Sequence, residues 1–229
     1  MAVARSPHTT LGDRVRDGSS YGLLFLLLLA SYLVVADAGT GRVANIVAVV
    51  LYLTVLELAL RISKARATVR RAGVVAGAAG LVLVAAVGGS GQRTVAGVVH
   101  LVFMVLLVAT IAAIIRRGLS YEEVRIEAIA GALCIYVLIG LTFASLYVVL
   151  NAFAHHPWLA TNGHPASLNQ TYYFSFTALT TVGFGDVVPV TNFGRTLSMI
   201  EAILSQVFLA SVVALVVSRF GASRPRKGG

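Results

Sequence analysis

The stretch Leu168–Pro189, LNQTYYFSFTALTTVGFGDVVP, decides the fold. Its first part, Leu168–Thr180, is apolar and aromatic and contains neither Pro nor Gly. This part is too short to cross a bilayer, so it predicts a re-entrant half-helix with Ser167 or Asn169 as its N-cap. The part that follows, Thr180–Asp186 (TTVGFGD), carries glycines at alternate positions. Because glycine adopts left-handed conformations at little steric cost, this spacing predicts a backbone that alternates between ordinary and left-handed residues.

The composition around this stretch is that of a membrane protein. The 229 residues are 58% hydrophobic and only 12% charged, with a mean hydropathy of +0.87, whereas soluble domains are about 25% charged. The charged residues are clustered, which leaves apolar runs long enough to cross a hydrocarbon core of about 30 Å. We therefore expect an all-α transmembrane fold with six membrane-spanning helices and the re-entrant half-helix between the last two. The expected spans are Tyr21–Ala36, Val43–Leu60, Ala72–Val87, Val95–Ile115, Ile126–Asn151 and Thr196–Phe220.

The distribution of positive charge predicts the orientation. Fifteen of the 18 Lys and Arg residues flank the spans on one side, which places both termini in the cytoplasm under the positive-inside rule. The same placement makes anionic lipid, rather than nucleic acid, the partner of the net charge of +9. The predicted regions are the cytoplasmic N-terminus (1–20), a four-helix peripheral membrane domain (21–115), a linker (116–126), a pore domain (127–220) and a short basic tail (221–229).

The first span has an alternative interpretation. Arg14 and Arg16, a leucine-rich stretch and Ala36-Asp37-Ala38 are similar to a secretory signal with its cleavage site. The long polar segment before the stretch favours a retained helix in the cell membrane. The single cysteine, Cys134, excludes an intrachain disulfide.

The stretch YYFSFTALTTVGFGDVVP resembles the pore region of tetrameric potassium channels, and the order span, half-helix, filter, span is also that of the family. A pore selective for K⁺ must replace the ion's water ligands, and rings of backbone carbonyls do so. The resemblance implies that the carbonyls of Thr181, Val182, Gly183 and Phe184 bind K⁺, and the Thr181 hydroxyl can add a further ligand. It also implies a homotetramer, because one chain supplies one filter strand.

Further residues are expected to support the filter. The resemblance places Gly185 in the filter and Asp186 just outside it, bonded behind the filter to the half-helix. Phe184 stands where many relatives have tyrosine, so a hydroxyl that braces the filter is absent. The pair Tyr172 and Tyr173 stands where many relatives have tryptophans; one hydroxyl is a candidate partner of Asp186, or both rings pack on lipid and neighbouring helices. Glu201, an acidic residue inside a span, is predicted to bond to the half-helix.

The last span supplies the candidate cavity and gate residues, Ser205, Gln206 and Val213. Ser205 stands where the family often has a bending glycine, and a serine bends a helix only modestly. Gln206 either faces the cavity or forms an interhelical hydrogen bond. The fourth span, Val95–Ile115, contains no Lys or Arg and has His100 as its only ionisable side chain. Since voltage sensing needs several charges within the field, we expect little intrinsic voltage dependence.

Three smaller features complete the predictions, and two of them remain open between two interpretations. Glu57 and Arg61 are predicted to form an ion pair one helical turn apart. The segment Gly118–Ile126 is either an interfacial helix that couples the peripheral helices to the gate or a plain polar connection. The outer-loop histidines either sense external pH or merely titrate; they are His155, His156 and His164.

These features predict a potassium-selective channel subunit that conducts K⁺ passively. A non-selective cation channel and a non-conducting sensing subunit are the alternatives, although neither accounts well for an intact TVGFG. A coupled K⁺ uptake protein would carry several degenerate filter repeats, and this chain has one motif. No nucleophile, metal cluster or phosphate-binding loop indicates an enzyme.

Overall fold

The computed structural model describes residues 91–118, 126–154 and 156–222, together with a few isolated positions between 54 and 82. In chain order the elements are α4 (Gly91–Gly118), α5 (Ile126–Phe153), β1 (Leu159–Thr161), β2 (His164–Pro165), α6 (Leu168–Leu179), β3 (Val188–Pro189) and α7 (Asn192–Ala222). Several predictions lie outside the described residues: the first three spans, the N-terminus, the Glu57–Arg61 pair, most of the linker, His155 and the end of the basic tail.

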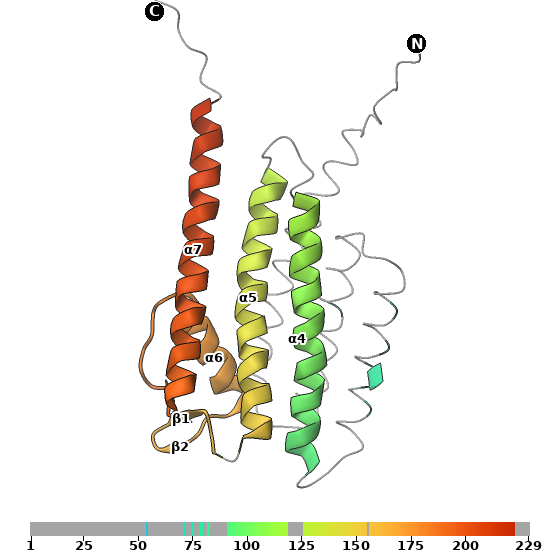
Figure 1. The fold of residues 1–229 in the computed structure, drawn as a ribbon, viewed down its shortest axis with the longest axis vertical. Coiled ribbons are helices and arrows are strands. Elements are labelled where there is room, and N and C mark those ends of the chain that lie inside the picture. The colour runs from blue at the N-terminus through green and yellow to red at the C-terminus, as the bar shows by residue number, and fades with distance from the viewer. Residues whose placement is uncertain are drawn as a thin grey trace, which may run out of the picture.

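Three of the described helices are long and apolar enough to cross a membrane. Their spanning segments are Thr94–Arg116, Ile129–Phe153 and Asn192–Ser218, which match the fourth, fifth and sixth predicted spans. Figure 1 shows α4, α5 and α7 side by side, with the short α6 tucked beside the lower half of α7. The described part of the chain therefore holds three of the six predicted spans, and the other three stay predictions.

Helix α5 lies at the centre and packs against α4, α6 and α7. Leu138, Leu141 and Ala144 on α5 are almost completely buried in the main hydrophobic cluster. Two small residues permit close packing: a Cβ on Gly97 of α4 would overlap Ala152 of α5, and a Cβ on Gly140 of α5 would lie 3.0 Å from Leu179 of α6. Glycine at these positions lets the neighbouring helix approach.

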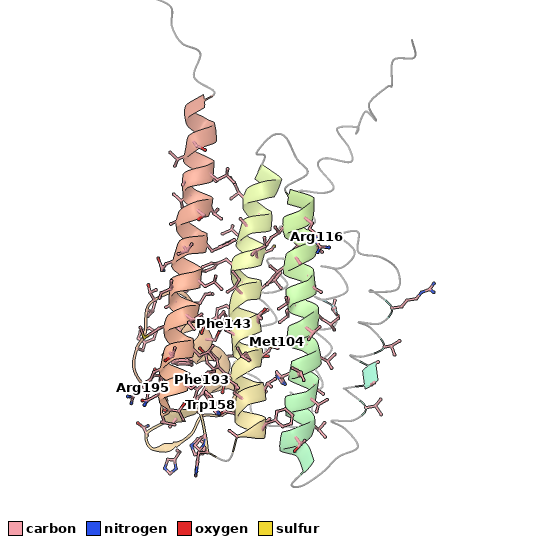
Figure 2. The ribbon with its side chains drawn as sticks, in the orientation of Figure 1. Met104, Arg116, Phe143, Trp158, Phe193 and Arg195 are labelled. Carbon is pink, nitrogen blue, oxygen red and sulfur yellow. The ribbon has the colours of Figure 1, made fainter. Side chains whose placement is uncertain are left out.

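A small antiparallel sheet, the outer sheet, joins the loop before α6 to the loop after it. Its strand order is β2-β1-β3, with Ala160 opposite Pro165 on one side and opposite Val188 on the other. The amide of Val190 donates to the carbonyl of Trp158, and the Trp158 ring meets Phe193 edge-on with centroids 5.0 Å apart. Figure 2 shows these two rings together at the lower end of α7. The chain that follows TTVGFGD is thus held by main-chain pairing.

Candidate functional site

The helix α6 begins at Leu168, as the sequence predicted, and Ser167 is its N-cap. Ser167 forms a capping box with Gln170: its Oγ accepts from the Gln170 amide at 3.3 Å, and Gln170 Oε1 accepts from the Ser167 amide at 2.8 Å. Two free amides of the first turn are satisfied in this way. The helix ends at Leu179 with Thr180 as its C-cap, so its partial negative end lies where TTVGFGD begins.

The backbone after α6 alternates in handedness. Positive φ values occur at Thr181 (58°), Gly183 (52°) and Gly185 (80°), which are every second residue. The two glycines were expected to adopt this conformation, but Thr181 was not. A residue with a Cβ in the left-handed region costs roughly 1–2 kcal/mol. The hydrogen bond from the Thr181 amide to the Ala178 carbonyl, at 3.0 Å, helps to hold this conformation.

The next two amides of this segment also point back to α6. The amides of Val182 and Gly183 both donate to the carbonyl oxygen of Thr177, at 3.0 and 3.2 Å. In a trans peptide the carbonyl points opposite to the amide N–H, and no cis peptide occurs among the described residues. The carbonyls of Thr181 and Val182 therefore point away from α6. They lie in a stretch, Thr180–Asp186, that is exposed along its whole length in the single chain.

Tyr173 supports this segment with both its hydroxyl and its ring. The Tyr173 hydroxyl donates to Asp186 Oδ1 at 3.2 Å, so Tyr173 is the tyrosine that meets Asp186. Its ring stacks on Phe184, with centroids 6.1 Å apart and planes inclined by 9°. The ring contact supports Phe184 from behind, although phenylalanine lacks the hydroxyl that tyrosine would offer.

Tyr172 has a different environment, which matches the alternative in which its ring packs on a neighbouring helix, and its role as a filter support stays a prediction. Its side chain is 1% exposed and packs in the main hydrophobic cluster. Its ring meets His100 of α4 edge-on, with centroids 6.2 Å apart. Successive residues of a helix point about 100° apart, so neighbouring tyrosines face different partners. Tyr172 therefore connects α6 to α4, whereas Tyr173 contacts the TTVGFGD segment.

Glu201 lies where the sequence predicted, bonded to α6. Its Oε1 is 2.5 Å from Ser175 Oγ of α6, and its Oε2 accepts from the hydroxyl of Tyr147 of α5 at 2.9 Å. All three side chains are completely buried. Ser175 and Tyr147 were not singled out from the sequence, because nothing in their local pattern shows that they share a partner 26 and 54 residues away.

A second hydroxyl from α5 reaches the end of α6. The Tyr136 hydroxyl donates to the carbonyl of Leu179 at 3.0 Å. The last carbonyls of a helix have no intrahelical partner, so this bond satisfies one of them. The sequence signal was a tyrosine in the middle of an apolar span, where a polar group needs a partner. Tyr136 therefore anchors α6 to α5. Ser175, through Glu201, connects α6 to α7 and to Tyr147 of α5.

The three cavity or gate candidates on α7 do not share one face. Gln206 and Val213 are exposed in the single chain, as cavity-lining residues must be. Ser205 is fully buried, and its hydroxyl donates to the Ala202 carbonyl at 2.8 Å. It lies one helical turn from Glu201, on the packed face of α7, so its side chain does not line an exposed surface. Helix α7 runs unbroken through this position.

Comparison with known proteins places the similarity in the same region. The family described as "Ion channel" matches residues 131–222, which include most of α5 and all of α6, TTVGFGD and α7. The inward rectifier potassium channel Kirbac3.1 of Paramagnetospirillum magnetotacticum is 32% identical over 88 residues, covering 36% of this chain and 29% of that protein. Protein LctB of Geobacillus stearothermophilus is 35% identical over 82 residues, covering 34% of this chain and 60% of that protein.

A eukaryotic relative shows the same pattern. The potassium voltage-gated channel protein shk-1 of Caenorhabditis elegans is 31% identical over 77 residues, covering 32% of this chain and 14% of that protein. The chain thus spans less than two thirds of the length of each of these relatives. The matches and the apolar helices indicate a membrane protein that is related to ion channels, among them potassium channels, and they point to a channel rather than an enzyme.

Proposed function

We propose that this chain is a subunit of a potassium-selective channel that conducts K⁺ passively through the TTVGFGD segment. The observation that carries the proposal is the direction of the backbone. The Val182 and Gly183 amides point toward α6, so the carbonyls of Thr181 and Val182 face the exposed side, and every second residue from Thr181 to Gly185 has a positive φ. Such a strand presents carbonyl oxygens to a dehydrated cation.

A homotetramer accounts for the exposed surfaces of the single chain. One strand cannot surround an ion, whereas four strands around an axis form rings of carbonyls. The TTVGFGD segment and α7 are both largely exposed in the single chain, and α7 has a row of exposed apolar side chains. We expect other copies of the chain and lipid to bury that surface. The exposed apolar residues of α7 include Ile200, Ile203, Leu204, Val207, Val213, Leu215 and Val217.

The proposed orientation follows the charges. Arg116 lies at the upper end of α4, and Arg195 lies near the lower end of α7 (Figure 2). We place the end with Arg116 in the cytoplasm, where the positive-inside rule puts the side of the expected spans that carries most Lys and Arg residues, and the outer sheet outside the cell membrane. The basic flanks then face anionic lipid headgroups. The C-terminal end of α6 points its partial negative charge toward a cation in the pore.

The experiment compares K⁺ and Na⁺ flux through the purified protein in liposomes. We expect K⁺ flux to exceed Na⁺ flux by a large factor in the wild type. Equal fluxes of the two ions would refute selectivity and favour a non-selective cation channel. An absence of flux from correctly assembled tetramers would favour a non-conducting subunit.

A pair of glycine variants separates a role in the filter from ordinary backbone strain. Gly183 (φ 52°) and Gly163 (φ 79°, in the turn between β1 and β2) both have positive φ, and a Cβ on either would meet no atom of the described residues within 4 Å. Alanine at either position therefore costs a similar roughly 1–2 kcal/mol of backbone strain. We expect Gly183→Ala to abolish selective flux and Gly163→Ala to retain it. Equal effects would mean that Gly183 has no special role in conduction.

A further inference from the structure

A single buried carboxyl group connects three helices behind the TTVGFGD segment. Glu201 on α7 contacts Tyr147 of α5 through Oε2 at 2.9 Å and Ser175 of α6 through Oε1 at 2.5 Å. The Ser175 Oγ lies in turn 2.8 Å from the carbonyl oxygen of Gly140 on α5. Gly140 has no side chain, so α6 approaches α5 closely enough for this contact.

The number of available protons determines the ionisation of this cluster. A serine hydroxyl has one proton, yet Ser175 Oγ is at hydrogen-bond distance from two oxygens. The Gly140 carbonyl can only accept, so the Ser175 proton belongs to that bond. The short contact between Ser175 Oγ and Glu201 Oε1 then needs a proton from the carboxyl group. If Glu201 were ionised and accepted from Ser175, the contact between Ser175 Oγ and the Gly140 carbonyl would bring two lone pairs together without a proton.

The surroundings of Glu201 also disfavour a charge. The polar groups recorded at its carboxyl are the hydroxyl of Tyr147 from α5 and the hydroxyl of Ser175 from α6, and Ser198 of α7 lies beside the Tyr147 hydroxyl. None of these side chains is cationic. An ionised carboxylate that is fully buried in a membrane-spanning helix without a cationic partner is costly, whereas a neutral carboxylic acid is not.

The cluster acts on the filter segment through α6. Ser175 lies two residues before Thr177, whose carbonyl oxygen accepts from the amides of Val182 and Gly183. A shift of α6 at Ser175 therefore moves the acceptor that orients the Thr181 and Val182 carbonyls. A carboxyl group on α7 is thus connected, through Ser175 and α6, to backbone oxygens that it does not touch.

We propose that Glu201 is a neutral carboxylic acid that positions the filter: it donates to Ser175, accepts from Tyr147 and thereby fixes α6 against α5 and α7. The positioning role rests on the proposed function, whereas the protonation state does not. Glu201 acts on the TTVGFGD segment through Ser175 and α6, so it is a positioning residue.

The first test compares Glu201→Gln with Glu201→Leu. A glutamine amide donates to Ser175 and accepts from Tyr147, which is the hydrogen-bond pattern of the neutral acid and not that of a carboxylate. We expect Glu201→Gln to retain the K⁺ flux and the K⁺ over Na⁺ ratio to within about twofold, because its hydrogen bonds are conserved. Glu201→Leu leaves two buried hydroxyls without this partner, so we expect the flux to fall by about tenfold or more. A Gln variant as impaired as the Leu variant would overturn the proposal.

The second test does not depend on conduction. The infrared difference spectrum between the wild type and Glu201→Gln, in lipid at neutral pH, should contain the carbonyl stretch of a protonated carboxyl group and no carboxylate bands. Carboxylate bands in that difference would refute the neutral form. If the wild type conducts no K⁺ selectively, the proposed function fails while the spectrum still decides the protonation state. If the Leu variant does not fold, the Gln variant and the spectrum remain decisive.

Discussion

Replacing Gly140 with alanine tests how closely α6 must approach α5. A Cβ at this position would lie 3.0 Å from Leu179 Cδ2 and 3.2 Å from Phe176 Cζ. These distances are shorter than normal van der Waals contacts between carbons, which are about 3.5–4.0 Å. Leu179 is fully buried and cannot simply rotate into open space. The extra methyl group must therefore strain the side chains or push the C-terminal end of α6 outward.

Gly131 on the same helix provides the matched control. Among the described residues a Cβ there would meet only Ile114 Cγ2 at 3.9 Å, an ordinary contact. Both substitutions gain the same intrinsic helix preference of alanine over glycine, about 1 kcal/mol, so this contribution cancels when the two variants are compared. The difference that remains is the overpacking at Gly140, which typically costs about 1–3 kcal/mol. We expect Gly140→Ala to be less stable than Gly131→Ala by that amount.

The assay is equilibrium unfolding of both variants in the same detergent, followed by K⁺ and Na⁺ flux in liposomes. Gly131→Ala should be at least as stable as the wild type and conduct normally. Gly140→Ala should lose both stability and selectivity, because the end of α6 carries the first residue of TTVGFGD. Equal stability of the two variants, or normal selectivity in Gly140→Ala, would refute the reasoning that this close approach positions the segment.

Three further predictions concern the hydrogen bond between Tyr173 and Asp186, the ring pair beside the outer sheet and the voltage dependence of conductance. Tyr173→Phe and Asp186→Ala should couple by about 0.5–1.5 kcal/mol in a double-mutant cycle of stability, because each removes the same hydrogen bond; additive effects would show that the bond contributes nothing. Trp158→Ala should speed hydrogen exchange of the Val190 amide severalfold, and Trp158→Phe should not, because an aromatic pair with Phe193 is worth roughly 0.5–1.5 kcal/mol. Equal exchange in both variants would argue against a role for the ring pair. Conductance in a planar bilayer should change little with membrane potential, because the middle of α4 carries no basic residue and each charge moved contributes only about 2.3 kcal/mol per 100 mV. A steep conductance–voltage curve would contradict this.

Much of the site was accessible from local sequence because its determinants are local. The half-helix at Leu168 follows from an uninterrupted apolar run behind a capping serine, and the structure has it as α6. The left-handed backbone at Gly183 and Gly185 follows from the spacing of the glycines. The sequence did not reveal the same conformation at Thr181, because its cost is offset by hydrogen bonds to α6 that depend on the folded turn.

Long-range contacts were predicted only in part. The sequence identified Glu201 as an acidic residue that needed a partner, since a charge inside a span is costly. It could not identify that partner as Ser175 together with Tyr147, because the three residues are brought together by the packing of α5, α6 and α7. It also left Tyr172 and Tyr173 as equal candidates for Asp186, and only the rotation of α6 about its axis distinguishes them.

The sequence by itself determined an apolar membrane chain, the position of the short helix and the alternating glycines of TTVGFGD, because hydrophobic runs, caps and glycine spacing act within a few residues. The tertiary structure decided which side chains hold that segment in place. Tyr173 contacts the segment directly, and Tyr136 contacts the end of α6 that precedes it. Glu201 and Ser175 are connected to the segment through hydrogen bonds between helices. The outer sheet holds the chain that follows the segment. These contacts depend on helix rotation and on the close approach at Gly140, which arise only when the helices pack together.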